Sequence, residues 1–140
     1  MLHENTTSPQ ILRQIYIQII RVVLGGSCQV WDGGLTVKNR RSLERVQKLC
    51  LYTILPNHTY KQALKKLEID DLQTRRTKLT LRFAKLNKAE EKLSHLFTQN
   101  RKTHNMKTKF PEKYVPQVNT LRFMKSPIIQ MQKLLNKLDN

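Results

Sequence analysis

The stretch from Leu35 to Leu55, LTVKNRRSLERVQKLCLYTIL, combines apolar and basic residues with the period of an α-helix. Successive helical residues advance by about 100°, so residues three or four apart share a face. One face of this stretch is apolar and consists of Leu43, Val46, Cys50 and Ile54. The opposite face carries a row of cations, with Arg40 alone off the row: Lys38, Arg41, Arg45 and Lys48. The pattern predicts a helix that packs on its apolar side and exposes a basic row on the other.

A second apolar stripe, in SPQILRQIYIQIIRVVLGG (8–26), also predicts a helix. Ser8 suits the N-cap, Pro9 the first turn and Gly25 the end of this helix. The stripe that we expect to be buried consists of Ile11, Ile15, Ile19 and Val22, and it is thickened by Leu12, Ile20 and Val23. The many β-branched residues leave a strand as an alternative, although the length of the stretch favours a helix. Arginines and glutamines interrupt the apolar run, so we expect no membrane span.

Further along the chain, helices are predicted at 60–69, 70–97 and 128–138. In the helix at 70–97, Asp70 is the predicted N-cap, and Glu90 with Glu91 marks a break. Its predicted core face consists of Leu72, Leu79, Phe83 and Leu86. A second basic row lies beside that face and consists of Arg75, Lys78, Arg82 and Lys85. The predicted fold is all-α, a small helical bundle at 1–97 followed by a basic, partly irregular extension at 98–140 that ends in a short helix.

The net charge of the chain is +16, from 26 lysines and arginines against 10 acidic residues. Residues 1–36 carry as many bases as acids, so the whole excess lies in residues 37–140. Such an excess repels itself unless a polyanion offsets it, which favours nucleic acid or an anionic membrane surface as the partner, with an acidic protein as an alternative. Because two helices and the extension are basic, we expect nucleic acid, either RNA or DNA, and no membrane partner. Aromatic residues are sparse, so contacts to the nucleic-acid backbone are predicted rather than base stacking.

No pattern in the sequence indicates a catalytic site, a metal site or a cofactor. Cys28 and Cys50 are too few for a disulfide scaffold, and the histidines lack metal-ligand spacing. Asp70 and Asp71 resemble the metal-binding pair of polymerases, but a predicted helix follows them and capping is the ordinary role there. Trp31, between two pairs of glycines, is expected to pack rather than to bind a ligand. The polar start MLHENTTSPQ lacks a signal-peptide layout, so we expect an intracellular protein, in the nucleus or cytoplasm.

Three stretches taken together are similar to one known family. VWDGGLTVKNRRSLERVQKLCLYTIL, LKKLEIDDLQTRRTKLTLRFAKL and HNMKTKFPEKYVPQVNTLRFMKSPIIQMQKLLN resemble, in order and spacing, the C-terminal region of non-LTR (jockey-like) retrotransposon reverse transcriptases. The similarity runs from Leu12 to Asn136. Its most specific pieces are Trp31 with Leu35-Thr36, the run LERVQK, the pattern RR-K-L-L-FAK at 75–85, and Met131-Gln132 with Leu134-Leu135-Asn136. The chain departs from the family pattern at Gly25-Gly26 and at Asp32-Gly33-Gly34.

The resemblance implies the helical thumb and the segment beyond the catalytic palm of an RNA-directed DNA polymerase. It also implies that Lys38, Arg41, Arg45 and Lys48 lie along a template–primer duplex. No palm, polymerase aspartate pair or endonuclease fits in this sequence, so we expect a truncated or domesticated fragment that binds nucleic acid and is not an enzyme. Two alternatives stay open: a protein-interaction element that uses the apolar first helix, and a translated transposon relic with no selected role.

Overall fold

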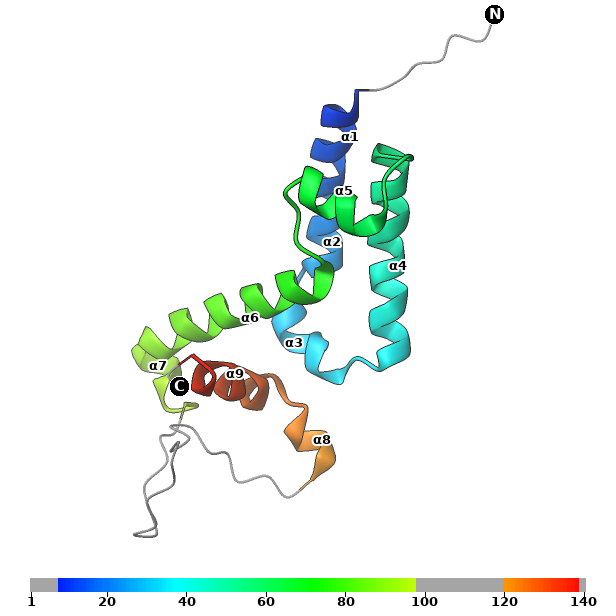
Figure 1. The fold of residues 1–140 in the computed structure, drawn as a ribbon. Helices are drawn as coiled ribbons and strands as arrows, with labels where there is room; N and C mark the ends of the chain where they lie inside the picture. Colours follow the sequence, from blue (N-terminus) through cyan, green and yellow to red (C-terminus); the bar gives the residue numbers. More distant parts are fainter. Residues whose placement is uncertain (1–7, 98–119, 139–140) are drawn as a thin grey trace, which may run out of the picture. The chain divides into compact units, whose positions relative to one another are not determined.

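The computed structural model describes residues 8–97 and 120–138, which fold into helices joined by turns (Figure 1). No strand occurs in these two ranges, so the all-α prediction is confirmed and the strand alternative for the first stretch is wrong. The predicted irregular segment at 98–119 lies outside the described residues. The chain divides into two compact units. Of the described residues, unit 1 contains 8–26 and 36–75, and unit 2 contains 27–35, 76–97 and 120–138.

Unit 1 surrounds one apolar core. Its elements are α1 (Pro9–Ile15), η1 (Tyr16–Ile20), α2 (Arg21–Gly25), α4 (Val37–Ile54), α5 (Tyr60–Lys66) and the first turn of α6 (Leu72–Ala89). α1, η1 and α2 follow one another without a break, and α4 packs against α1 and α5 (Figure 1). The buried core consists of Tyr16, Leu51, Ile54, Ala63, Leu67 and Ile69. The helix predicted at 60–69 is therefore confirmed as α5, and its three lysines are exposed.

η1 is a π-helical segment, and it changes which face of the first helix is buried. The backbone N–H of Arg21 donates to the carbonyl of Tyr16, five residues earlier. The buried residues of this stretch are Tyr16, Arg21 and Gly25. The first two are five residues apart, which is the spacing of the π-helical turn. The prediction of a buried stripe is wrong for Ile11, Ile15, Ile19 and Val22, which are 43–61% exposed, and for Val23. Leu12 and Ile20 do pack against the core. The extra residue in the π-helical turn rotates the later part of the helix, so the arginine rather than an isoleucine points inward.

α4 forms where the sequence predicts a helix, but the centre of its buried face is shifted. The buried residues are Gln47, Leu51 and Ile54. Leu43 and Cys50, which were predicted to be core, are half-buried, and Val46 is 43% exposed. The prediction for Val46 is therefore wrong. The face is centred on Gln47 because that side chain has hydrogen-bond partners on several elements of unit 1.

Unit 2 has a separate apolar core of Ala84, Phe97, Met131 and Leu135. Its elements are α3 (Cys28–Trp31), η2 (Asp32–Gly34), the rest of α6, α7 (Glu91–Ser94), α8 (Leu121–Met124) and α9 (Pro127–Asn136). The predicted break near Glu90 and the predicted C-terminal helix are both confirmed. A Cβ atom on Gly33 would lie 2.5 Å from the carbonyl oxygen of Lys125, so η2 can approach the end of α8 only with glycine at this position.

α6 begins one residue later than predicted and buries a different face. Asp71, rather than Asp70, caps the helix: its Oδ1 accepts from the N–H of Thr74 (2.9 Å) and its Oδ2 accepts from the Thr74 hydroxyl (2.6 Å). Partial burial acts to raise the pKa of Asp71, but the hydrogen bonds from Thr74 outweigh it and lower that pKa. Two residues of the predicted core face, Phe83 and Leu86, are 42% and 62% exposed, so that prediction is wrong for them. The buried positions of α6 instead include Arg76, Thr80, Ala84 and Asn87.

Candidate nucleic-acid interface

The basic row of α4 is exposed along its whole length. It consists of Lys38, Arg41, Arg45 and Lys48, each of them exposed. Thr36 fixes the start of α4 because its hydroxyl accepts a hydrogen bond from the N–H of Asn39 (3.2 Å). From Lys38 to Lys48 the row spans about 15 Å, at roughly 1.5 Å per residue. This length matches the rise of roughly four nucleotides along one strand of a duplex.

The basic row begins at the N-terminal end of α4, where cations are least favourable for helix stability. Lys38, Arg40 and Arg41 lie near the N-terminus of α4, and its first turn contains no acidic residue. The N-terminus of a helix carries partial positive charge, so a cation in the first turn, as Lys38 is, destabilises the helix by about 0.3–1 kcal/mol, and the effect falls off beyond that turn. The last turn, where cations would be favourable, contains none. The placement therefore opposes helix stability and concentrates positive potential at the start of α4.

Gln47 holds the opposite side of α4 in the core. Its side-chain oxygen accepts from the hydroxyl of Tyr16 (2.6 Å), and its Nε2 donates to the hydroxyl of Tyr60 (2.9 Å) and to the carbonyl of Asp70 (3.2 Å). Gln47 is 0% exposed, so these bonds satisfy an amide that has no access to water. Because the partners come from three different segments, they fix the rotation of α4 about its axis and hence which residues face solvent.

Glu44, one turn before Gln47 on α4, joins the hydrogen-bond network formed by Gln47 and its partners. Its carboxylate accepts hydrogen bonds from the hydroxyl of Tyr60 and from the backbone N–H of Leu72 (3.4 Å). Burial, followed by the hydrogen bond and the charge of Glu44, raises the pKa of Tyr60. Burial likewise raises the pKa of Tyr16 to about 12. Both phenols therefore remain protonated hydrogen-bond donors at neutral pH.

Arg21 joins the same network from α2. It is 8% exposed, and its Nη2 donates to the carbonyl of Asp70 (2.7 Å), the group that also accepts from Gln47. Burial, and then the nearby Arg75 guanidinium, lowers the pKa of Arg21. A single carbonyl thus links α2, α4 and the segment before α6. Sequence reasoning missed this network because its members are polar residues within segments that were read by their apolar pattern.

One aromatic side chain continues the basic row beyond Lys48. Tyr52 is 60% exposed and lies four residues after Lys48 and seven after Arg45, so helix periodicity places it on the same face. Leu49, which is 67% exposed, lies beside it. The small number of aromatic residues in the chain gave no indication of Tyr52; its spacing from Arg45 and Lys48 was the available signal.

The second predicted row is divided between the two units. Arg75 is half-buried and belongs to unit 1, whereas Lys78, Arg82 and Lys85 are exposed and belong to unit 2. The three exposed cations follow the helical spacing on α6, so unit 2 carries a basic row of its own.

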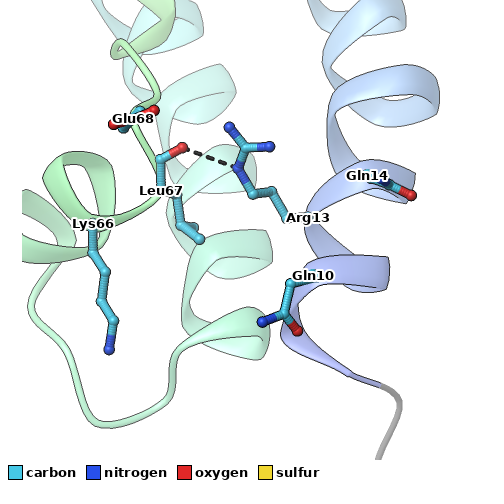
Figure 2. Close-up of a pocket in the computed structure, with 6 residues that line it drawn as sticks. All are labelled: Gln10, Arg13, Gln14, Lys66, Leu67 and Glu68. Carbon is cyan, nitrogen blue, oxygen red and sulfur yellow. Dashed lines mark hydrogen bonds between the residues drawn. The ribbon is translucent and has the colours of Figure 1, made fainter.

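A pocket of about 390 Å³, open to solvent, lies in unit 1 between the start of α1 and the end of α5 (Figure 2). It is lined by Gln10, Arg13, Gln14, Lys66, Leu67 and Glu68. Arg13 points from α1 toward the end of α5, where its Nε donates to the carbonyl of Leu67 (3.0 Å; Figure 2). Cations and a carboxylate line the same small space, so the pocket favours neither an anionic nor a cationic ligand.

Within residues 8–97 and 120–138, no group of three or more His, Cys, Asp or Glu side chains could hold a metal ion.

One stretch of the described chain, Pro9–Gly34, is long and apolar enough to cross a membrane by length and composition alone. Mostly buried core helices of soluble proteins and N-terminal signal sequences meet the same criterion, and 22% of this stretch's most apolar window is buried. Arg13 and Arg21, both within this stretch, donate hydrogen bonds to backbone carbonyls of unit 1.

In unit 2 a second buried arginine lies on α6, in which Phe83 and Leu86 of the predicted apolar face are exposed and Leu72 and Leu79 are buried or half-buried. Arg76 is 1% exposed, and its Nε lies 2.7 Å from Oδ1 of Asp32. Its guanidinium carbon lies 5.9 Å from the centroid of the Trp31 ring, within the range of a cation–π contact. Trp31 therefore packs, as predicted, and it packs against a charged side chain.

Comparison of the chain with protein-family models, with curated protein sequences and with solved structures gives no match. The resemblance to retrotransposon reverse transcriptases thus rests on the three quoted stretches alone.

Proposed function

We propose that this chain binds nucleic acid through the basic row of α4 and catalyses no reaction on it. The observation that carries the proposal is the exposure of Lys38, Arg41, Arg45 and Lys48 along one helix face whose opposite side is fixed in the core by Gln47. Each cation can neutralise one backbone phosphate and release its counterions. The ligand is RNA or DNA, bound mainly through its backbone. Lys78, Arg82 and Lys85 on α6 give unit 2 a further row of the same kind.

Two features favour nucleic-acid binding over the alternative that the basic row of α4 is only exposed to solvent. The cations at the start of α4 oppose the helix dipole, an arrangement that helix stability alone does not favour. The resemblance to a reverse-transcriptase thumb further suggests a template–primer type duplex as the ligand. On this proposal the chain is a transposon-derived fragment of the nucleus or cytoplasm that retains binding and lacks polymerase chemistry.

The test is a salt titration of binding to a short blunt duplex, measured by fluorescence anisotropy. Four or more phosphate contacts predict a slope of log affinity against log salt of about −3.6 or steeper on a duplex. The double variant Arg41→Glu with Arg45→Glu should weaken binding at low salt and flatten the slope by about two. Its thermal melting should change little, because exposed charges contribute only about 0–1 kcal/mol to stability.

A matched control changes the same charge on another helix of unit 1. Lys61→Glu with Lys65→Glu lowers the net charge equally, and both lysines are exposed on α5. This control should lower affinity less than the α4 variant does. Equal losses from the two variants would mean that binding follows total charge, and a slope near zero for the wild-type protein would reject backbone binding altogether.

One observation favours a second candidate function, a protein-interaction element. The apolar side chains of the first helix, Ile11, Ile15, Ile19 and Val22, are 43–61% exposed in unit 1. Such a face suits a helical protein partner. Ile15→Lys with Ile19→Lys should abolish binding to such a partner and leave the salt-dependent binding of nucleic acid intact, which separates the two functions.

A further inference from the structure

We propose that the ligand of α4 carries an unpaired base, and that this base stacks on Tyr52 while the basic row holds the adjoining backbone. The inference rests on the proposed function, because it names the kind of nucleic acid that this face takes. It differs from the prediction made from the sequence, in which the small number of aromatic residues favoured backbone contacts without base stacking.

The register of α4 puts the aromatic ring in line with the cations. Tyr52 follows Arg41, Arg45 and Lys48 at eleven, seven and four residues, all of them helical spacings. Its side chain is 60% exposed, so the ring is open to a ligand. Along the axis it lies about 6 Å beyond Lys48, at roughly 1.5 Å per residue. A nucleotide next to the last phosphate bound by Lys48 is therefore within reach of the ring.

The face changes character along its length. Its first part carries the four cations, and the part after Lys48 has no basic residue and exposes Leu49 at 67% and Tyr52 at 60%. A helix that followed a continuous duplex would place these two side chains against phosphates, which neither of them neutralises. A strand that leaves its duplex at Lys48 instead presents the flat face of a base. Cations that follow the backbone together with an exposed aromatic ring are the combination used for single-stranded nucleic acid.

The test compares a short single strand, a blunt duplex and the same duplex with a single-stranded overhang, each labelled and measured by fluorescence anisotropy. For the wild-type protein the overhang should raise affinity above that of the blunt duplex. Tyr52→Ala should weaken binding to the single strand and to the overhang roughly 5- to 150-fold, and leave binding to the blunt duplex unchanged. Tyr52→Phe keeps the ring and should retain wild-type affinity for all three ligands.

A spectroscopic readout distinguishes stacking from a general loss of contacts. With 2-aminopurine placed in the overhang next to the duplex, the wild-type protein and Tyr52→Phe should change its emission on binding, whereas Tyr52→Ala should not. Circular dichroism of each variant verifies that α4 is intact.

The remaining outcomes separate this inference from the proposed function. If Tyr52→Ala binds every ligand like the wild-type protein while Arg41→Glu with Arg45→Glu does not, base stacking is wrong and backbone binding stands. Equal weakening of the blunt duplex and the single strand by Tyr52→Ala also overturns stacking. If neither variant changes affinity, α4 is not the interface, and both proposals fall together.

Discussion

Each unit buries an arginine, and the surroundings that compensate the two charges differ. In unit 1, Arg21 is 8% exposed and donates to the backbone carbonyl of Asp70 (2.7 Å), within a network that contains Gln47 and two phenols. In unit 2, Arg76 is 1% exposed and forms an ion pair with the carboxylate of Asp32 (2.7 Å). One charge is thus stabilised by dipoles and the other by an opposite charge.

The difference predicts that the two units fail under different conditions. A network of dipoles depends on the protonation of its phenols, which alkaline pH removes. An ion pair depends on the presence of its carboxylate, which a single substitution removes. Trp31 is the only tryptophan of the chain and contacts Arg76, so its fluorescence reports on unit 2. The chain has four tyrosines, so the absorbance of Tyr16 in the network of unit 1 is obtained as the difference between the wild-type protein and Tyr16→Phe.

The largest expected effect comes from Asp32→Ala, which leaves the Arg76 charge buried without its carboxylate. Removal of one partner of a buried pair destabilises a protein by about 3–5 kcal/mol. Because Asp32 is 19% exposed, we expect the lower end of this range. Urea unfolding followed by Trp31 fluorescence measures the loss of unfolding free energy, and hydrogen exchange should show loss of protection in unit 2 before α4.

The double variant Asp32→Leu with Arg76→Met is the control for that experiment. It removes both charges and puts apolar side chains in their place, a replacement that is often neutral for buried pairs. The double variant should therefore be more stable than Asp32→Ala. If the two are equally unstable, the packing of η2 rather than the unpaired charge is the cause.

A smaller effect is expected from alkaline pH, and it should begin in unit 1. The phenol of Tyr16 loses its proton near pH 10 in the unfolded chain, whereas burial raises its pKa to about 12 in the folded chain. The folded state therefore holds this proton more tightly, so the stabilisation is complete below pH 10 and is lost as the pH rises to about 12. At 1.36 kcal/mol per pKa unit, the loss is roughly 2–3 kcal/mol.

The measurement is urea unfolding at several pH values between about 9 and 11.5. The local signal is the difference in tyrosinate absorbance between the wild-type protein and Tyr16→Phe. Tyr16→Phe cannot ionise at this position and should show a flatter decline in stability. An unchanged decline in that variant would assign the alkaline sensitivity to other groups.

The extent of most helices in this chain was predictable, and the inward faces were not. α4, α5 and α9 follow from their periodicity, and exposure of Lys38, Arg41, Arg45 and Lys48 follows with them. The buried face of the first helix did not follow, because isoleucine and valine occur on both sides of it and only the π-helical segment decides which side packs. No residue pattern in this stretch predicts the π-helical segment.

The polar core positions were unpredictable for a different reason. Gln47 and Arg76 are buried because their partners come from distant segments: Tyr16 and Asp70 for Gln47, and Asp32 for Arg76. The apolar pattern of one helix contains no information about partners on distant segments. The basic row is visible in the sequence because exposure needs no partner, whereas a buried polar residue is defined by what it contacts.

The smallest expected effect is a gain of stability in unit 1 from Glu68→Gly. Glu68 follows the end of α5 with φ of 54°, a left-handed conformation that disfavours residues with a Cβ atom. The N–H of Ile69 donates to the carbonyl of Leu64 (2.9 Å) and that of Glu68 to Lys65 (3.3 Å), the two bonds of a Schellman motif, in which glycine is preferred.

Glycine relieves the left-handed strain of about 1–2 kcal/mol but gives the unfolded chain more freedom, so the net gain should be about 1 kcal/mol or less. The effect should concentrate in unit 1, because the segment after Glu68 presents the Asp70 carbonyl that accepts from Arg21 and Gln47. Urea unfolding gives the size of the gain, and hydrogen exchange of α5 and α4 gives its location. Glu68→Ala removes the carboxylate and keeps the Cβ atom. If Glu68→Ala stabilises as much as Glu68→Gly does, the charge of Glu68 and not its backbone conformation is the source of the strain.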